Sequence, residues 1–157
     1  MSASPLPVRA LAEFVATMFL LIAVVGSGIA AENLSGGNAA LALLANAIAT
    51  GCALFVLIIA FAPVSGAHMN PLVTLGAAAW DGFARKAVPV YWLAQVAGAV
   101  AGMWLAHTMF ELPLLQTSQH VRTGAGQWLA EAVATLGLLL VVVGDDGSTV
   151  RAASVEG

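Results

Sequence analysis

Long apolar stretches, interrupted by very few charged residues, dominate the sequence. From Asn33 to Trp80 there is no Asp, Glu, Lys or Arg over 48 residues, whereas one helix that crosses a bilayer needs only about 20. Three further stretches, 10–31, 87–110 and 126–144, have the length and apolar character of a membrane span. The pattern therefore predicts an all-α membrane protein.

The uncharged run is too long for a single helix. We expect a full span over 38–62, irregular backbone around Pro63 to Met69, and a short helix over 71–80. Pro71 fits the first helical position and Asn70 fits the N-cap. Such a helix reaches about 15 Å, half of the hydrocarbon thickness of about 30 Å, so it is predicted to be re-entrant. Irregular backbone at that depth is typical of a buried or water-filled pore.

Composition and charge agree with a multi-pass membrane protein. The 157 residues are 61% hydrophobic and 8% charged, with a mean hydropathy of +0.95, which excludes an ordinary soluble domain. The net charge of −3 argues against nucleic acid as a partner. Four basic residues, Arg9, Arg85, Lys86 and Arg151, fall on one side of the predicted spans and only Arg122 on the other. This bias predicts a cytoplasmic N-terminus in a cell membrane.

An internal repeat relates the first and last predicted spans. Residues 11–26 recur at 129–144 with eleven identities in sixteen positions, including Glu13 and Glu131, which are costly residues in lipid. The two copies must cross the membrane in opposite directions, so the repeat is inverted. No second Asn-Pro pair follows, and 145–157 is polar. We therefore expect an incomplete bundle of four spans and one half-helix, all in a single domain over 1–157 with a solvated tail.

The stretch from Ser65 to Thr74 carries a resemblance. It reads Ser-Gly-Ala-His-Met-Asn-Pro-Leu-Val-Thr, and Glu13 and Gln95 accompany it in the first and third predicted spans. The chain resembles the major intrinsic protein family, the aquaporins and glycerol facilitators, over roughly residues 9 to 144. Only Leu72 departs from the family's usual loop. The resemblance implies six spans and two half-helices that meet at mid-membrane, with one pore per protomer, usually in a homotetramer.

The resemblance also implies roles for particular residues. Asn70 would donate its side-chain amide to a passing solute, and the carbonyls of Gly66, Ala67 and His68 would form a ladder of acceptors. Thr50 resembles the position where water channels carry Phe and glycerol channels carry Trp, which suggests a wider, more polar filter for small uncharged solutes besides water. The predicted pore-lining residues are Asn70, Pro71, Gly66, Ala67, His68 and Thr50.

Simple electrostatics supports a pore at this helix start. A half-helix N-terminus concentrates about half an elementary positive charge and several free amides, which repel cations and orient water. We expect Glu13 and Glu131 to be structural, buried acids that accept from the amides of re-entrant loops. A proton relay would need further acidic or His residues along one path. His68, with the two other histidines, shows no metal-site spacing.

Other residues are predicted to be structural. Cys52 is interpreted as core filler, and Tyr91, Trp92, Trp80 and Trp128, near the ends of predicted spans, as interfacial anchors. No nucleophile, nucleotide fingerprint or cofactor motif is present, so no enzyme activity or cofactor is expected.

The sequence favours a passive channel for water or small neutral solutes. The alternatives are a truncated, non-conducting polypeptide, a half-channel completed by a partner chain, and, ranked last, a proton-driven transporter.

Overall fold

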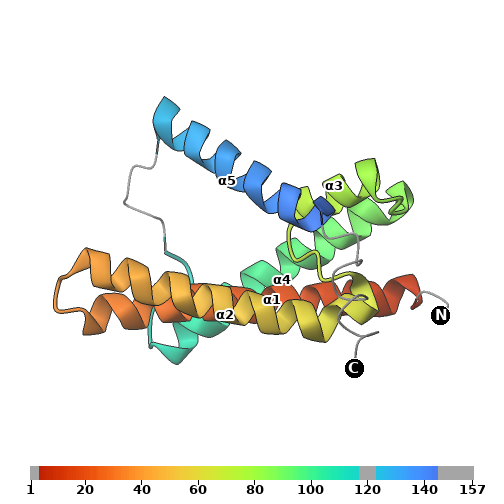
Figure 1. Cartoon of the computed structure of the whole chain (residues 1–157). Helices are drawn as coiled ribbons and strands as arrows, with labels where there is room; N and C mark the ends of the chain where they lie inside the picture. The colour runs from red at the N-terminus through yellow and green to blue at the C-terminus, as the bar shows by residue number, and fades with distance from the viewer. Residues whose placement is uncertain (1–3, 117–122, 145–157) are drawn as a thin grey trace, which may run out of the picture.

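The computed structural model describes residues 4–116 and 123–144, so the predicted polar tail over 145–157 lies outside the described residues. Within these ranges the chain is helical and contains no strand, which confirms the all-α fold (Figure 1). The elements are α1 (Leu6–Leu34), α2 (Ala39–Ser65), α3 (Pro71–Trp80), the 3-10 turn η1 (Arg85–Ala87), α4 (Val88–Met109) and α5 (Ala125–Gly144).

In the part of the chain that the structure describes, three helical segments are long and apolar enough to cross a membrane: Leu6–Leu34, Ala39–Ser65 and Arg85–Met109. Their outward side chains are large and apolar; Leu43, Phe55 and Leu93 are 70%, 67% and 73% exposed. Water would penalise so much exposed apolar surface, whereas lipid tails accept it. The chain is therefore a multi-pass membrane protein.

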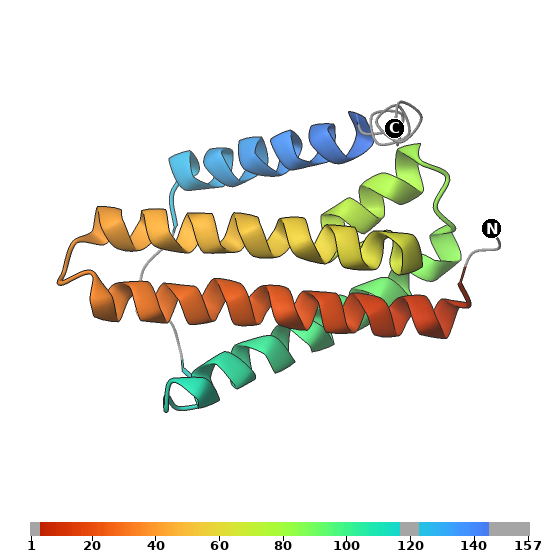
Figure 2. The same ribbon diagram turned by 60° about the horizontal axis from the view of Figure 1, so that its bottom comes forward.

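Helices α1 and α2 form an antiparallel hairpin, and α4 runs in the same direction as α1 (Figure 2). Gly36 and Gly37, at φ +61° and +85°, turn the chain between α1 and α2. Asn38 caps α2, its side-chain oxygen accepting from the Leu41 amide at 3.1 Å. The start of α1, the end of α2 and the start of α4 consequently lie at one end of the bundle.

The irregular backbone after α2 begins three residues later than the sequence predicts. Pro63 lies inside α2, which continues to Ser65. A proline removes only one donor from the helix, and membrane helices tolerate this when neighbours supply partners. The helix ends at Gly66, which adopts φ +93° and donates its amide to the Ala62 carbonyl at 3.1 Å.

Helices α1 and α4 approach each other at two glycines. A Cβ on Gly98 would lie 2.3 Å from the Phe14 carbonyl oxygen, and one on Gly102 would lie 2.3 Å from that of Met18. Only a residue without a side chain fits at these two crossings.

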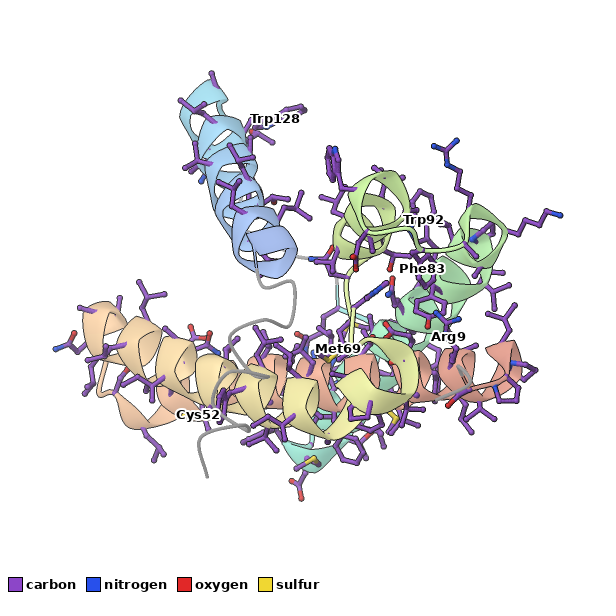
Figure 3. The ribbon with its side chains drawn as sticks, turned by 45° about the vertical axis from the view of Figure 1, so that its right-hand side comes forward. Arg9, Cys52, Met69, Phe83, Trp92 and Trp128 are labelled. Carbon is purple, nitrogen blue, oxygen red and sulfur yellow. The ribbon has the colours of Figure 1, made fainter. Side chains whose placement is uncertain are left out.

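Two residues expected to be buried are exposed. Glu131 lies on α5, which packs on α3 near Gly76 and Leu139. In the described ranges no loop amide reaches its carboxylate, so the prediction that Glu131 is a buried acid is wrong for this structure. Cys52 is also exposed, on the outer face of α2 (Figure 3), which corrects its interpretation as core filler.

Candidate functional site: the loop and half-helix start at Asn70

The loop between α2 and α3 has an unusual backbone. Gly66, Ala67 and Met69 have φ of +93°, +50° and +47°. Left-handed conformations cost a residue with a side chain about 1 kcal/mol or more each. Ala67 and Met69 are nevertheless buried, and they pack with Ala16 of α1. Contacts from the surrounding helices must therefore hold the loop in this shape.

The carboxylate of Glu13 supplies the principal contacts. Its Oε1 accepts from the Ser65 hydroxyl at 2.7 Å and the His68 amide at 3.0 Å. Its Oε2 accepts from the Met69 amide at 2.7 Å and Gln95 Nε2 at 2.8 Å. The side chain is fully buried, yet four donors satisfy its charge. The predicted contact between Glu13 and the loop amides is confirmed.

A chain of hydrogen bonds links Glu13 to the start of α3. Gln95 Nε2 also donates to Thr74 Oγ1 at 2.9 Å, and that hydroxyl donates to the Asn70 carbonyl at 3.1 Å. His68 Nδ1 lies 3.1 Å from the same hydroxyl. The loop and the first turn of α3 therefore form one connected network.

Helix α3 begins where the sequence predicts. Asn70 has extended backbone, and its Oδ1 accepts from the Leu72 amide at 2.8 Å. Pro71 occupies the first turn, and its carbonyl accepts from Trp92 Nε1 at 3.0 Å. The predicted N-cap and the helix bounds are confirmed. Since the amide oxygen of Asn70 serves the cap, its two N–H groups remain to donate elsewhere.

A cluster at the start of α1 holds the other end of the loop. The Tyr91 hydroxyl donates to the Ser65 carbonyl at 2.7 Å and accepts from Arg9 Nε at 2.9 Å. The Arg9 guanidinium lies 5.1 Å from the centre of the Phe83 ring and 5.3 Å from that of Tyr91. Figure 3 shows Arg9 beside Phe83. Tyr91 is completely buried, so its prediction as an interfacial anchor is wrong.

These contacts trace the path of the chain. Met69 packs against Ala16, whereas Phe83, after the end of α3, packs against Arg9. Ala16 lies about 10 Å deeper along α1 than Arg9, at 1.5 Å per residue. After α2, the loop thus leads the chain back into the bundle. Helix α3 then returns the chain to the end of the bundle where α2 ends and α4 starts (Figure 2).

The structure places the predicted pore residues in two groups. Gly66, Ala67, His68 and Asn70 lie together in the loop. Thr50 lies on α2, one turn before Leu54, which packs on the loop cluster. The Thr50 hydroxyl is buried and has no hydrogen-bond partner among the described residues.

Sequence reasoning missed Arg9 and Thr74, and it misjudged Tyr91. Tyr91 reaches the Ser65 carbonyl across 26 residues and Arg9 reaches Tyr91 across 82, whereas Thr74 lies within six residues of its partners Asn70 and His68. The available signal was weak: Arg9 directly precedes the first predicted span, and Tyr91 is the single tyrosine.

We predict that Tyr91→Phe destabilises the fold by about 1 to 3 kcal/mol, because the buried Ser65 carbonyl loses its donor. The thermal midpoint of the detergent-solubilised protein measures this loss. Trp92→Phe is the control; it also removes one hydrogen bond to a backbone carbonyl, but at a side chain that is 40% exposed. An equal midpoint for wild type and Tyr91→Phe would contradict the role assigned to Tyr91.

A bundle of long apolar helices around a short helix that starts at a buried loop defines a multi-pass helical membrane protein. The family model described as Major intrinsic protein matches residues 2–155. The chain therefore belongs to the major intrinsic protein family, whose members are channels rather than enzymes.

Individual relatives agree with this assignment. Aquaglyceroporin AqpS from Rhizobium meliloti (strain 1021) is 49% identical over 135 residues, which are 86% of this chain and 58% of the relative. Probable aquaporin TIP1-1 from Oryza sativa subsp. japonica is 38% identical over 138 residues, 85% of this chain and 54% of the relative. Aquaporin NIP1-4, also from Oryza sativa subsp. japonica, is 42% identical over 100 residues, which are 64% of this chain and 35% of the relative. The chain thus spans about half the length of these relatives.

Proposed function

We propose that this chain forms, or contributes to, a passive membrane channel for water and small uncharged solutes of the glycerol type. The observation that carries the proposal is the start of α3, where Asn70 caps the helix with its oxygen and keeps its amide donors free. The relatives named aquaglyceroporin and aquaporin support water and glycerol as the solutes.

The chemistry follows from the helix start. Amides at the N-terminus of α3 and the Asn70 side chain present donors and positive potential, which favour the oxygen of a neutral solute and repel cations. The carbonyls of Gly66, Ala67 and His68 are proposed to accept from the solute's hydroxyls. Three buried polar atoms, Thr17 Oγ1, Thr50 Oγ1 and Gln95 Oε1, have no partner among the described residues. Such atoms are typical of an interior that holds water.

The setting in the membrane is part of the proposal. We propose that α3 is a re-entrant half-helix and that the N-terminus is cytoplasmic in a plasma or inner membrane. We also propose that the protomers associate as homotetramers. The excess of basic residues on one side of the spans supports the orientation.

A second candidate is a half-channel whose other wall comes from a partner chain. The exposure of Glu131 favours it, because the repeat-related Glu13 is buried under a loop and Glu131 has none beside it in the described part of the chain.

Osmotic shrinkage of proteoliposomes tests the channel, and it also measures the effect predicted for Asn70→Asp. Wild type should shrink faster than empty vesicles. Asp caps a helix as well as Asn, but it removes both amide donors and adds a negative charge. We expect water permeability to fall about tenfold, as loss of one hydrogen bond worth about 1.4 kcal/mol implies, and cation leak to rise.

As a control, the amount of protein incorporated into the wild-type and Asn70→Asp vesicles is verified from the density of the vesicles. Shrinkage at the rate of empty vesicles would reject conduction by this chain alone and favour the half-channel. Conduction that is unchanged in Asn70→Asp would reject the role assigned to Asn70.

A further inference from the structure

A groove between α3 and the start of α4 combines one cation with apolar walls. Its volume is about 360 Å³, within the usual range of small-molecule sites, about 300 to 1,000 Å³. The second half of α3, the turn η1 and the first turn of α4 supply its lining residues: Leu75, Ala78, Ala79, Arg85, Val88 and Pro89. Among the lining residues that the structure describes, Arg85 alone is charged. This feature is called the Arg85 groove below.

The groove changes in character along its length. Leu75, Ala78 and Ala79 are spaced by three and four residues, so they share one face of α3. Arg85 lies at the end of the bundle where α4 starts (Figure 2). Leu75 lies about 6 Å farther from this end than Ala79, at about 1.5 Å per residue. The cation therefore lies at the mouth of the groove, and carbon surface continues inward from it.

The mouth of the groove carries positive charge. Arg85 and Lys86 are exposed and directly precede α4, whose first turn contains no acidic residue. A helix start is the positive end of the helix dipole, where a cation is unfavourable and an anion is stabilised. Asp81 follows α3 but is not among the described lining residues. An anion bound beside Arg85 would thus be attracted by the guanidinium and by the start of α4.

Two observations indicate that this mouth lies at the surface of the bilayer. Trp80, next to Ala79 at the end of α3, is 70% exposed, and tryptophan favours the level of the lipid headgroups. Arg85 is also the first residue of the apolar segment Arg85–Met109, which is long enough to cross a membrane. The guanidinium is therefore expected at the depth of headgroup phosphates, and the apolar walls at the depth of acyl chains.

An anionic phospholipid matches both parts of the groove. A guanidinium binds phosphate oxygens in a bidentate manner, and an acyl chain fits the carbon surface of Leu75 and Val88. Basic pockets between membrane helices bind anionic headgroups in the same way. An uncharged occupant, by contrast, would leave the cation at the helix start without a counter-ion.

We propose that the Arg85 groove binds one anionic phospholipid, with the phosphate on Arg85 and an acyl chain along α3. The proposed cytoplasmic orientation of this end puts the site in the leaflet that is rich in anionic lipids. The bound lipid bridges α3 and α4, so it stabilises the folded chain. This site goes beyond the proposed function, because it requires no conduction.

Native mass spectrometry of the chain in dodecyl maltoside tests the charged part of the site. Palmitoyl-oleoyl phosphatidylglycerol should bind wild type as a single lipid. Palmitoyl-oleoyl phosphatidylcholine, which has the same chains and no net charge, should need a concentration about tenfold higher. Arg85→Gln should weaken binding of phosphatidylglycerol about tenfold, through the loss of a charge-assisted contact. Lys86→Gln is the matched control; it removes the same charge outside the groove and should change binding less than about twofold.

A second pair of variants tests the apolar part. Ala79→Phe fills the Arg85 groove, whereas Ala45→Phe places the same ring in a different groove, between α1 and α2. Both alanines are exposed, so both variants should fold. Only Ala79→Phe should weaken binding of phosphatidylglycerol and remove the rise in thermal midpoint that this lipid gives wild type.

Several results would overturn the site. Equal binding of the two lipids, or equal losses in Arg85→Gln and Lys86→Gln, would show unspecific attraction to a basic surface. Unchanged binding in Ala79→Phe, or displacement of the lipid by inorganic phosphate, would show that the apolar walls hold no acyl chain. A dimer that Arg85→Gln dissociates would assign the groove to a second copy of the chain. None of these measurements depends on vesicle shrinkage, so a failed lipid site and a failed channel are distinguishable.

Discussion

Glu13→Ala is expected to abolish stable folding of this chain. The change leaves the Ser65 hydroxyl, the His68 and Met69 amides and Gln95 Nε2 without their acceptor in a fully buried site. Each unsatisfied buried donor costs about 1 to 3 kcal/mol, and proteins are stable by only about 5 to 15 kcal/mol. A loss above about 4 kcal/mol is therefore expected. Gel filtration in detergent after stepwise heating measures the fraction that stays monodisperse.

Two control variants separate the hydrogen bonds from the volume of the side chain. Glu13→Gln keeps the size of the side chain and one acceptor oxygen, but it turns an N–H group toward other donors. Its loss of stability should therefore lie between those of wild type and Glu13→Ala. Glu131→Ala removes the repeat-related carboxylate, which is exposed, and should leave this chain within about 0.5 kcal/mol of wild type. Equal stability of Glu13→Ala and Glu131→Ala would contradict the anchoring role of Glu13.

The second large effect is expected at the crossing of α1 and α4. In the double variant Gly98→Ala, Gly102→Ala, each new Cβ would lie 2.3 Å from a backbone oxygen of α1. The helices must separate, because neither backbone can yield as a flexible side chain would. Overpacking usually costs about 1 to 3 kcal/mol per site, so the pair should lose about 3 kcal/mol or more. The loss should appear as a lowered midpoint in a detergent unfolding titration.

Gly51→Ala is the matched control for this clash. Gly51 lies in α2 and a Cβ there meets nothing within 4 Å. Alanine favours a helix interior by about 0.5 to 1 kcal/mol over glycine, so this variant should be neutral or slightly more stable. If the double variant behaved like Gly51→Ala, the close approach of α1 and α4 would be wrong.

The short helix α3 was predictable because its signals are local. Asn70 and Pro71 are adjacent, and capping depends only on the first turn, so the bounds of α3 follow from the sequence. Pro63 misled the prediction of where α2 ends, because the cost of a proline in a helix depends on the partners that surround it.

The contacts of the buried residues were harder to predict. The carboxylate of Glu13 in an apolar span indicated a buried partner, and the loop was the natural candidate. Tyr91 sits near a helix end like an interfacial anchor, and only its contacts with the Ser65 carbonyl and the rings of His68 and Phe83 show that it is buried. Glu131 lies in a similar local sequence to that of Glu13 but is exposed, because a sequence repeat does not reproduce the tertiary contacts around a residue.

The sequence by itself determined the all-helical membrane fold, the family and the start of α3, because apolar length, helix capping and a contiguous motif act over short distances along the chain. Only the tertiary structure decided which side chains besides Glu13 hold the loop, namely Gln95, Thr74, Tyr91 and Arg9. Hydrogen bonds between distant segments depend on how helices cross, and for α1 and α4 the crossing is set where Gly98 and Gly102 admit the backbone of α1.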